Sequence, residues 1–306
     1  MPLRASAGMT IGITGASGLV GSALGFRLLA DGHRVLPLGR KEGSRLFSPA
    51  AENRSAPFLP DAVVHLAGEP IARGRWNAAK KERIRDSRVE GTRVLCQTLA
   101  EQVPPPRVLV CSSAIGFYGN RGDELLDEDS GPGEGFLAEV VQSWEQAARP
   151  AIERGIRVVH LRFGMILSRR GGALGKMLGP FQYGLGGRIG DGRQYWSWIA
   201  LDDAVGAVCH ALTTNSLVGP VNAVAPRAIT NADFTAALGH VLGRPTFAPL
   251  PAWVARLVFG QMADELLLAS TRVVPRRLRE LGYVFRHGDL PAALRHLLGR
   301  PATTVG

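Results

Sequence analysis

The sequence predicts an α/β protein with a doubly wound parallel sheet. Short apolar segments alternate with longer amphipathic segments along the first half of the chain, and the short segment Ala62–Leu66 is an apolar run. Such a run is typical of a strand in a parallel sheet that helices cover on both faces. Repeated strand–helix–strand units also require right-handed crossovers, which place the helices on both sides of the sheet.

Each predicted element follows from its own pattern. Strands are expected at the short apolar segments, which are Thr10–Thr14, Arg34–Leu38, Ala62–Leu66, Arg107–Cys111 and Ile156–Leu161. Helices are expected where apolar residues recur at helical spacing, which is the case at Leu19–Ala30, Trp76–Gln102 and Phe136–Arg154. Gly32 ends the first helix and Pro104 follows the second, which agrees with the usual signals for helix ends.

The pattern changes in the second half of the chain. A large α/β domain is expected over residues 10–226, with glycine-rich insertions over 171–200 on the substrate side of the sheet. A small, mainly helical C-terminal domain is expected over residues 227–300. Its predicted helices are Asn231–Leu242, Pro251–Phe259, Ala263–Ala269, Pro275–Leu281 and Leu290–Leu298. Residues 1–9 are expected to form a flexible extension and residues 301–306 a loose tail.

Three glycines follow the first strand and open the first helix. In this context Gly15 allows a tight turn, Gly18 lets the backbone approach a diphosphate, and Gly21 lets the helix pack closely on the strand. The free N–H groups at the helix start then bind the phosphates. The turn therefore predicts a Rossmann-type dinucleotide site, with a tight turn alone as the alternative. Its residues are Gly15, Ala16, Ser17, Gly18, Leu19 and Val20.

The end of the second strand indicates which dinucleotide is bound. Gly39, Arg40 and Lys41 stand where an NAD-selective domain carries an acidic residue that accepts from the ribose 2′-OH. An arginine there suits a 2′-phosphate, since its planar fork forms charge-assisted hydrogen bonds with phosphate oxygens. The sequence therefore favours NADP(H), the alternative being a solvated Arg–Lys pair on a loop.

Charge and composition exclude several classes of protein. The 306 residues carry a net charge of +10, but the arginines are spread along the chain without a stacking motif or a recognition helix, so no nucleic-acid binding is expected. A phosphorylated cofactor or an anionic small-molecule substrate explains the positive net charge equally well. No apolar run approaches the roughly 20 residues that a membrane span needs. The oligomeric state stays open between monomer and homodimer.

The cysteines indicate the compartment. Cys96, Cys111 and Cys209 share neither a metal-ligand spacing nor a Cys-x-x-Cys spacing. Each lies in an apolar stretch, so we expect buried, reduced thiols in a cytoplasmic protein and no metal site.

Several further motifs occur in an order that belongs to a known family. They include HLAGEPI at His65–Ile71, GFYG at Gly116–Gly119, FLAE at Phe136–Glu139 and WIALDD at Trp198–Asp203, and the match continues to Val274 and Pro275. On these residues the chain resembles the extended short-chain dehydrogenases/reductases, and within them the atypical epimerase family proteins with a C-terminal domain of unknown function. The resemblance covers nearly the whole chain.

The resemblance implies a shell of residues around the cofactor. It places Leu66 and Ala67 beside the adenosine half, and Arg88 and Met165 nearer the nicotinamide. Besides the glycine turn, the complete implied shell is Gly39, Arg40, Leu66, Ala67, Gly68, Glu69, Arg88 and Met165. Simple strand packing is the alternative for Leu66 and Ala67.

The catalytic set of ordinary members is missing. Register from the motifs puts Ala114 at the Ser/Thr position, Phe136 and Val140 at the Tyr and Lys positions, and Arg88 at the Asn position. A phenylalanine has no proton to transfer, so the usual acid/base step has no carrier. No catalytic residue is therefore assigned.

Other polar residues nearby have structural explanations that compete with a catalytic role. His65 is expected to be a satisfied histidine at a strand end, Tyr118 to pack in a loop, and Glu139 to face solvent. Glu69 lies at the edge of the sheet where ligands bind, but a loop or helix cap is an equal alternative. Ser113 is a further candidate. Asp202 and Asp203 are expected to cap the helix that follows Leu201.

Aromatic residues between Gly171 and Trp198 suggest an apolar substrate pocket, although half or more are expected in the core. They are Phe181, Tyr183, Tyr195, Trp196 and Trp198. Two functions remain open. One is an NADP(H)-dependent oxidoreductase of unknown substrate that uses another proton source. The other is a non-catalytic NADP(H)-binding sensor or scaffold. A strict sugar-nucleotide epimerase is disfavoured, because it needs the missing tyrosine and lysine.

Overall fold

The computed structural model describes residues 8–40, 47–49 and 59–301. Within these ranges the largest sheet has seven strands in the order β11-β7-β5-β4-β1-β2-β3. Its strands are β1 (Thr10–Thr14), β2 (Arg34–Arg40), β3 (Phe47–Pro49), β4 (Ala62–His65), β5 (Val108–Ala114), β7 (Arg157–Phe163) and β11 (Gly219–Ala223). Neighbouring strands pair in parallel, except β3, which is antiparallel to β2. The predicted parallel sheet is confirmed, and the short edge strand β3 is an addition to it.

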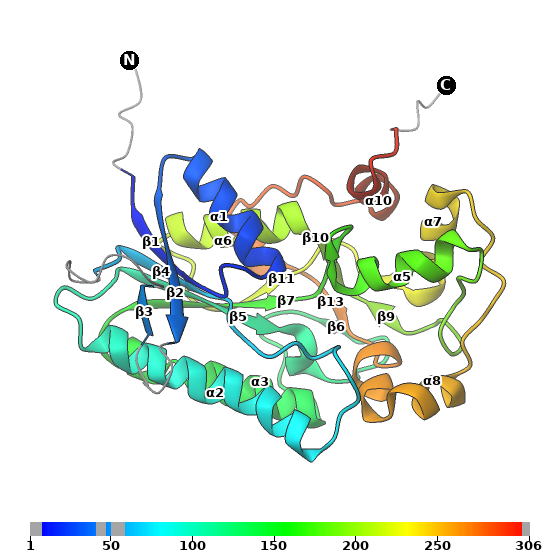
Figure 1. Ribbon diagram of the computed structural model, residues 1–306, viewed down its shortest axis with the longest axis horizontal. Coiled ribbons are helices and arrows are strands. Elements are labelled where there is room, and N and C mark those ends of the chain that lie inside the picture. Colours follow the sequence, from blue (N-terminus) through cyan, green and yellow to red (C-terminus); the bar gives the residue numbers. More distant parts are fainter. Residues whose placement is uncertain (1–7, 41–46, 50–58, 302–306) are drawn as a thin grey trace.

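Helices cover both faces of the sheet, as a doubly wound fold requires (Figure 1). One face carries α1 (Leu19–Ala30) and α6 (Leu201–Thr213), and the other carries α2 (Ala78–Ala100), α3 (Phe136–Gln146) and α4 (Arg149–Glu153). Under α1 and α6, Leu24 and Leu28 pack with Ile11 and Ile13 of β1. Successive side chains of a strand point to opposite faces, so each strand fills both cores.

The helix predicted over Phe136–Arg154 is interrupted. It divides into α3 and α4, and Pro150 lies in the first turn of α4. Proline has no N–H for an intrahelical hydrogen bond, but it is accepted in the first turn, where that N–H has no partner in any case. The prediction of one continuous helix is therefore wrong.

The insertions and the C-terminal part form a second core beside the sheet. Its elements are β8 (Met165–Ser168), α5 (Gly172–Gln182), β9 (Tyr195–Trp196), β10 (Trp198–Ala200), α7 (Asn231–Leu242) and α10 (Leu290–Leu298). The bounds of α7 and α10 are those predicted. Thr230 and Asp233 form a capping box at the start of α7, and Asp289 caps α10. The domain limits drawn from the sequence stay a prediction.

The rest of the C-terminal part is also mainly helical, as expected. It contains α8 (Ala252–Phe259), a single π-helical turn η2 (Ala263–Leu267) and α9 (Arg276–Glu280). Two small sheets tie it to the large domain: β12 (Ile229–Thr230) pairs with β9, and β13 (Arg272–Val273) pairs with β6 (Leu125–Leu126). No helix in the described part of the chain has the length and apolar character needed to cross a membrane.

One expectation for this region is confirmed and another is wrong. Phe181, Trp196 and Trp198 are buried in the second core, so half or more of the aromatic residues belong to the core as expected, whereas Tyr183 is 84% exposed. Asp202 and Asp203 do not cap α6, whose N-cap residue is Ala200 and which has no side-chain cap. The two carboxylates lie inside the first turn and contact the C-terminal segment instead.

Candidate functional site

The glycine turn between β1 and α1 has room for glycine alone at two of its positions. Gly15 has a φ of +68°, and a side chain on it would lie 2.9 Å from the Ala67 nitrogen. A side chain on Gly21 would lie 2.2 Å from the Gly15 carbonyl oxygen. The Gly18 N–H donates to the Gly15 carbonyl oxygen at 3.0 Å and closes the turn. These contacts explain why the chain needs glycine at these positions.

The start of α1 is open toward a ligand. No side chain caps this helix, and its first turn contains no acidic residue. The first amides of a helix have no intrahelical acceptor, so they favour an anion when no side chain satisfies them. A side chain on Gly18 would meet only the Gly15 carbonyl oxygen, at 3.2 Å, so the outer side of the turn is free of protein. This arrangement fits a diphosphate group.

The neighbouring strand ends converge on the same turn. Thr14 Oγ1 accepts hydrogen bonds from the backbone N–H groups of Leu66 at 3.1 Å and Ala67 at 3.2 Å. Leu38 of β2 pairs in register with Thr14, so Gly39 and Arg40 extend β2 at this edge. The side chain of Arg40, and Lys41 as a whole, lie outside the described residues.

Gly68 and Glu69 follow β4, and the side chain of Arg88 contacts this segment. The Arg88 guanidinium, which comes from α2, donates to the backbone oxygens of Glu69 and Ile84, each at 3.1 Å. A side chain on Gly68 would meet this guanidinium at 3.4 Å. Burial lowers the pKa of Arg88 to about 10, so the group stays protonated at neutral pH. Arg88, which the sequence register assigns to the asparagine position of ordinary members, is thus a buried cation.

Glu69 is an ion-pair partner rather than a free base. Its carboxylate accepts from Lys80 Nζ at 2.6 Å, and the same ammonium donates to the Pro70 carbonyl oxygen at 2.8 Å. The hydrogen bond from Lys80 holds the pKa of Glu69 below its ordinary value. Glu69 therefore anchors the loop that leads into α2 through an ion pair, and it does not cap α2, whose N-cap residue is Asn77.

Phe136 and Val140, which the register assigns to the tyrosine and lysine positions, carry apolar side chains and contact mainly apolar neighbours. Phe136 packs edge-on against Trp76, with ring centroids 5.5 Å apart, in a cluster that also contains Met262. Val140 is 1% exposed. Lys81 Nζ lies 5.1 Å from the Phe136 ring centroid, which is a cation–π distance.

Ser113 and Tyr118 belong to a buried network around Arg162. The Arg162 guanidinium forms two hydrogen bonds of 2.8 Å with the Glu145 carboxylate, which also accepts from Ser113 Oγ at 2.6 Å. The Tyr118 hydroxyl donates to Asn222 Oδ1 at 2.8 Å, and burial raises its pKa. These partners confirm that Tyr118 packs as a structural residue.

His65 is a hydrogen-bonded histidine at a strand end and Glu139 faces solvent, as the sequence predicts. The His65 ring contacts Thr14 Oγ1 at 2.6 Å and Thr92 Oγ1 at 3.0 Å, and burial lowers its pKa to about 4, so it is neutral. Glu139 faces solvent, with its side chain 67% exposed. Cys96 and Cys111 are buried free thiols as expected, but Cys209 is only partly buried.

Met165 is partly buried and packs against the second core. It follows the carboxyl end of β7 and opens β8, and its N–H donates to the Ser197 carbonyl oxygen at 2.8 Å. Gly172, at the start of α5, approaches α1, since a side chain on it would meet Leu19 at 3.5 Å. The start of α5 therefore lies close to the start of α1.

Sequence reasoning missed Glu265. From η2, its carboxylate accepts from the backbone N–H groups of Phe136 at 3.3 Å and Leu137 at 2.7 Å, so it caps α3. Gly135, the N-cap residue, offers no side chain for this purpose. A cap that arrives from 128 residues away leaves no local signal in the sequence.

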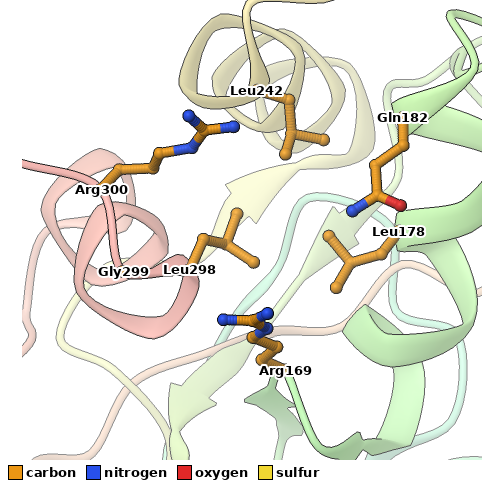
Figure 2. Close-up of a pocket in the computed structure, with 7 residues that line it drawn as sticks. All are labelled: Arg169, Leu178, Gln182, Leu242, Leu298, Gly299 and Arg300. Carbon is orange, nitrogen blue, oxygen red and sulfur yellow. The ribbon is translucent and has the colours of Figure 1, made fainter.

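Two cavities carry clustered cations. One, of about 290 Å³, is lined by Arg73, Arg75, Lys80 and Arg83, with Glu69 as its carboxylate. The other, of about 220 Å³, lies between α5, α7 and α10. Figure 2 shows the side chains of Arg169 and Arg300 on different sides of the same space, which the apolar side chains of Leu178, Leu242 and Leu298 also line. The first cavity adjoins the loop after β4, since Glu69 and Pro70 line it.

The sheet and its glycine turn define an α/β protein of the Rossmann class. A model of the NAD dependent epimerase/dehydratase family matches residues 11–224, and a domain of unknown function, DUF1731, matches residues 250–297. The chain therefore belongs to the NAD dependent epimerase/dehydratase family, in agreement with the resemblance described above.

Individual relatives match over nearly the full length. Epimerase family protein MT2273 of Mycobacterium tuberculosis is 42% identical over 96% of this chain and 99% of its own. Human epimerase family protein SDR39U1 is 38% identical over 95% of this chain and 100% of its own. The crystal structure of human SDR39U1 (isoform 2) with NADPH superposes with a TM-score of 0.87, at 36% identity, over 96% of this chain and 100% of that chain.

Proposed function

We propose that this protein binds NADP(H) in the glycine turn and acts as an oxidoreductase without the usual tyrosine and lysine. The observation that carries the cofactor assignment is the uncapped start of α1 beside Gly15 and Gly18. Unsatisfied helix amides at that place favour a phosphate group. The family membership and the NADPH in the human relative's structure support the same assignment.

The proposed contacts follow the strand ends. Backbone amides from Gly15 to Val20 hold the diphosphate, Gly39 and Arg40 select the 2′-phosphate, and Leu66 to Glu69 flank the adenosine half. Arg88 and Met165 lie on the nicotinamide side. When bound there, the reduced cofactor would supply hydride chemistry toward an electrophilic carbon of the substrate.

The proton must come from another source than in ordinary members. Phe136 and Val140 have no exchangeable side-chain proton, and the Tyr118 hydroxyl is buried and hydrogen-bonded. We propose that water supplies the proton. Arg88 stays charged at neutral pH and would favour negative charge that develops on the substrate oxygen.

We propose a small anionic molecule as substrate. The cavity lined by Arg73, Arg75, Lys80 and Arg83 offers positive charge beside the loop after β4. A carboxylate or phosphate ester of a carbonyl compound has the matching chemistry. We further propose a cytoplasmic protein with no nucleic-acid partner, as monomer or homodimer. The free cysteines support the compartment.

The test of this function is NADPH oxidation in the presence of a panel of carbonyl compounds, followed at the absorbance band of the reduced nicotinamide. The panel pairs each anionic compound with a neutral analogue of the same size. We expect turnover with anionic members and a raised KM in Arg75→Ser. Binding of NADPH without turnover across the whole panel would overturn the enzymatic assignment.

One observation favours a second candidate, a non-catalytic NADP(H)-binding sensor or scaffold. Val140 is buried and the partly buried Phe136 packs against Trp76, so apolar side chains occupy the two positions that the register assigns to the acid/base pair. Tight NADPH binding together with the absence of turnover would assign this function instead.

A further inference from the structure

Three potential metal ligands meet on the α1 and α6 side of the sheet. Asp202 Oδ2 lies 2.8 Å from His296 Nε2 and 3.6 Å from His287 Nε2. One ligand atom from each residue lies within 4.8 Å of the other two. The residues come from the first turn of α6, from the segment that precedes α10, and from α10 itself, which lies on this side of the sheet (Figure 1).

The spacing of these atoms suits a tetrahedral metal ion. Zinc binds imidazole nitrogen and carboxylate oxygen at about 2.0–2.2 Å, which places neighbouring ligand atoms roughly 3.3 Å apart. The two measured separations, 2.8 and 3.6 Å, lie on either side of that value. The His287 and His296 rings are stacked, with centroids 4.2 Å apart, so both imidazoles would turn to direct their nitrogens at one ion.

The backbone around the cluster is held in place without a metal. The adjacent Asp203 is fully buried and accepts from the backbone N–H groups of Arg286 and His287, each at 2.8 Å. Tyr283 donates its hydroxyl to the Asp203 carbonyl oxygen at 2.9 Å. Leu294 of α10 is buried in the second core, which fixes the helix that carries His296. A supported set of ligands loses little freedom when an ion binds.

We propose that Asp202, His287 and His296 form a binding site for a divalent transition-metal ion of the zinc class. Two imidazoles and one carboxylate favour zinc, nickel or copper over magnesium and calcium, which prefer oxygen ligands. Asp202 and His296 are 46% and 54% exposed, so a fourth position faces solvent. The ion fastens α10 to α6 and thereby joins the C-terminal part to the large domain.

The test uses the full chain without a polyhistidine tag. Isothermal titration with Zn²⁺ should give one ion per chain, whereas Mg²⁺ should give no binding. His287→Ala and Asp202→Asn should each weaken zinc binding at least tenfold, while His240→Ala, a change of an exposed histidine on α7, should leave it unchanged. Zn²⁺ should raise the Tm of the wild type by a few degrees and leave that of His287→Ala unaltered.

His287→Ala separates a metal site from a simple hydrogen bond. It removes one ligand but keeps the contact between Asp202 and His296. Zinc binding of equal strength in the wild type, His287→Ala and Asp202→Asn would overturn the proposal, as would the absence of stoichiometric binding by the folded wild type.

Discussion

Phe136 meets Trp76 edge-on, with ring centroids 5.5 Å apart, at the position that the sequence register assigns to the catalytic tyrosine of ordinary family members. One helical turn later, Val140 is buried at the position that the same register assigns to the lysine. The side chains that pack around these two residues are mainly apolar, as the two residues are themselves. Introducing a tyrosine and a lysine at these two positions would displace the present packing around Phe136 and Val140.

Val140→Lys should therefore destabilise the protein. An unpaired ammonium in this apolar position should lower the free energy of unfolding by about 3 kcal/mol. Urea denaturation followed by circular dichroism measures the change. Glu139→Lys, at the exposed neighbouring position, should change it by less than about 1 kcal/mol. Equal stability of the two variants would show that Val140 is not the core residue described here.

Gly18→Ala should separate cofactor binding from folding. The added methyl group meets only the Gly15 carbonyl oxygen at 3.2 Å, so the fold should tolerate it, but it projects where the diphosphate is expected. We expect NADPH binding at least tenfold weaker with little change in Tm. Gly25→Ala on the same helix, where nothing lies within 4 Å, should bind NADPH normally and be slightly more stable. Normal NADPH binding by Gly18→Ala would argue against the proposed site.

The stability of the protein should fall as the pH decreases from 7 to 4. Burial lowers the pKa of His65 from 6.5 to about 4, so below pH 6.5 the unfolded state takes up a proton that the folded state resists. The stability from this group is complete above pH 6.5, and about 3 kcal/mol of it is lost by pH 4. Burial also lowers the pKa of His160, which adds to the slope.

Urea denaturation at several pH values measures this dependence. His65→Gln, which keeps hydrogen-bonding capacity, should show a shallower slope between pH 7 and pH 4 than the wild type. The control His240→Gln, on an exposed position of α7, should keep the wild-type slope. A slope in His65→Gln as steep as in the wild type would contradict the neutral, buried state of His65.

Much of the fold could be predicted because its signals are local. The strand from Thr10 to Thr14 and the helices at Asn231–Leu242 and Leu290–Leu298 have the predicted bounds, since apolar periodicity and capping residues mark their ends. The unpredicted features depend on distant partners. Glu265 caps α3 from 128 residues away, and Asp203 holds the segment before α10 instead of capping its own helix.

The candidate site likewise has parts that the sequence predicts and parts that depend on distant partners. The glycine turn could be recognised from spacing, because each glycine answers a steric requirement of its neighbours. The role of Glu69 could not, since its carboxylate is committed by the position of Lys80 on the following helix. The three ligands Asp202, His287 and His296 also lie too far apart in the sequence to suggest a metal site by spacing.

The proposed selection of the 2′-phosphate by Arg40 predicts that the protein prefers NADPH to NADH. Arg40→Ala should weaken NADPH binding far more than NADH binding, because only NADPH carries the phosphate that the guanidinium would bind. Arg34→Ala, at the opposite end of β2, should leave both affinities unchanged. Equal losses for both cofactors in Arg40→Ala would remove the argument for phosphate selection.

Calorimetric titration of the folded wild-type protein with NADPH and with NADH tests the central assignment most directly. We expect one NADPH per chain and an affinity for NADH at least tenfold lower. If neither nucleotide bound to the folded protein, the dinucleotide site at the start of α1 would be contradicted.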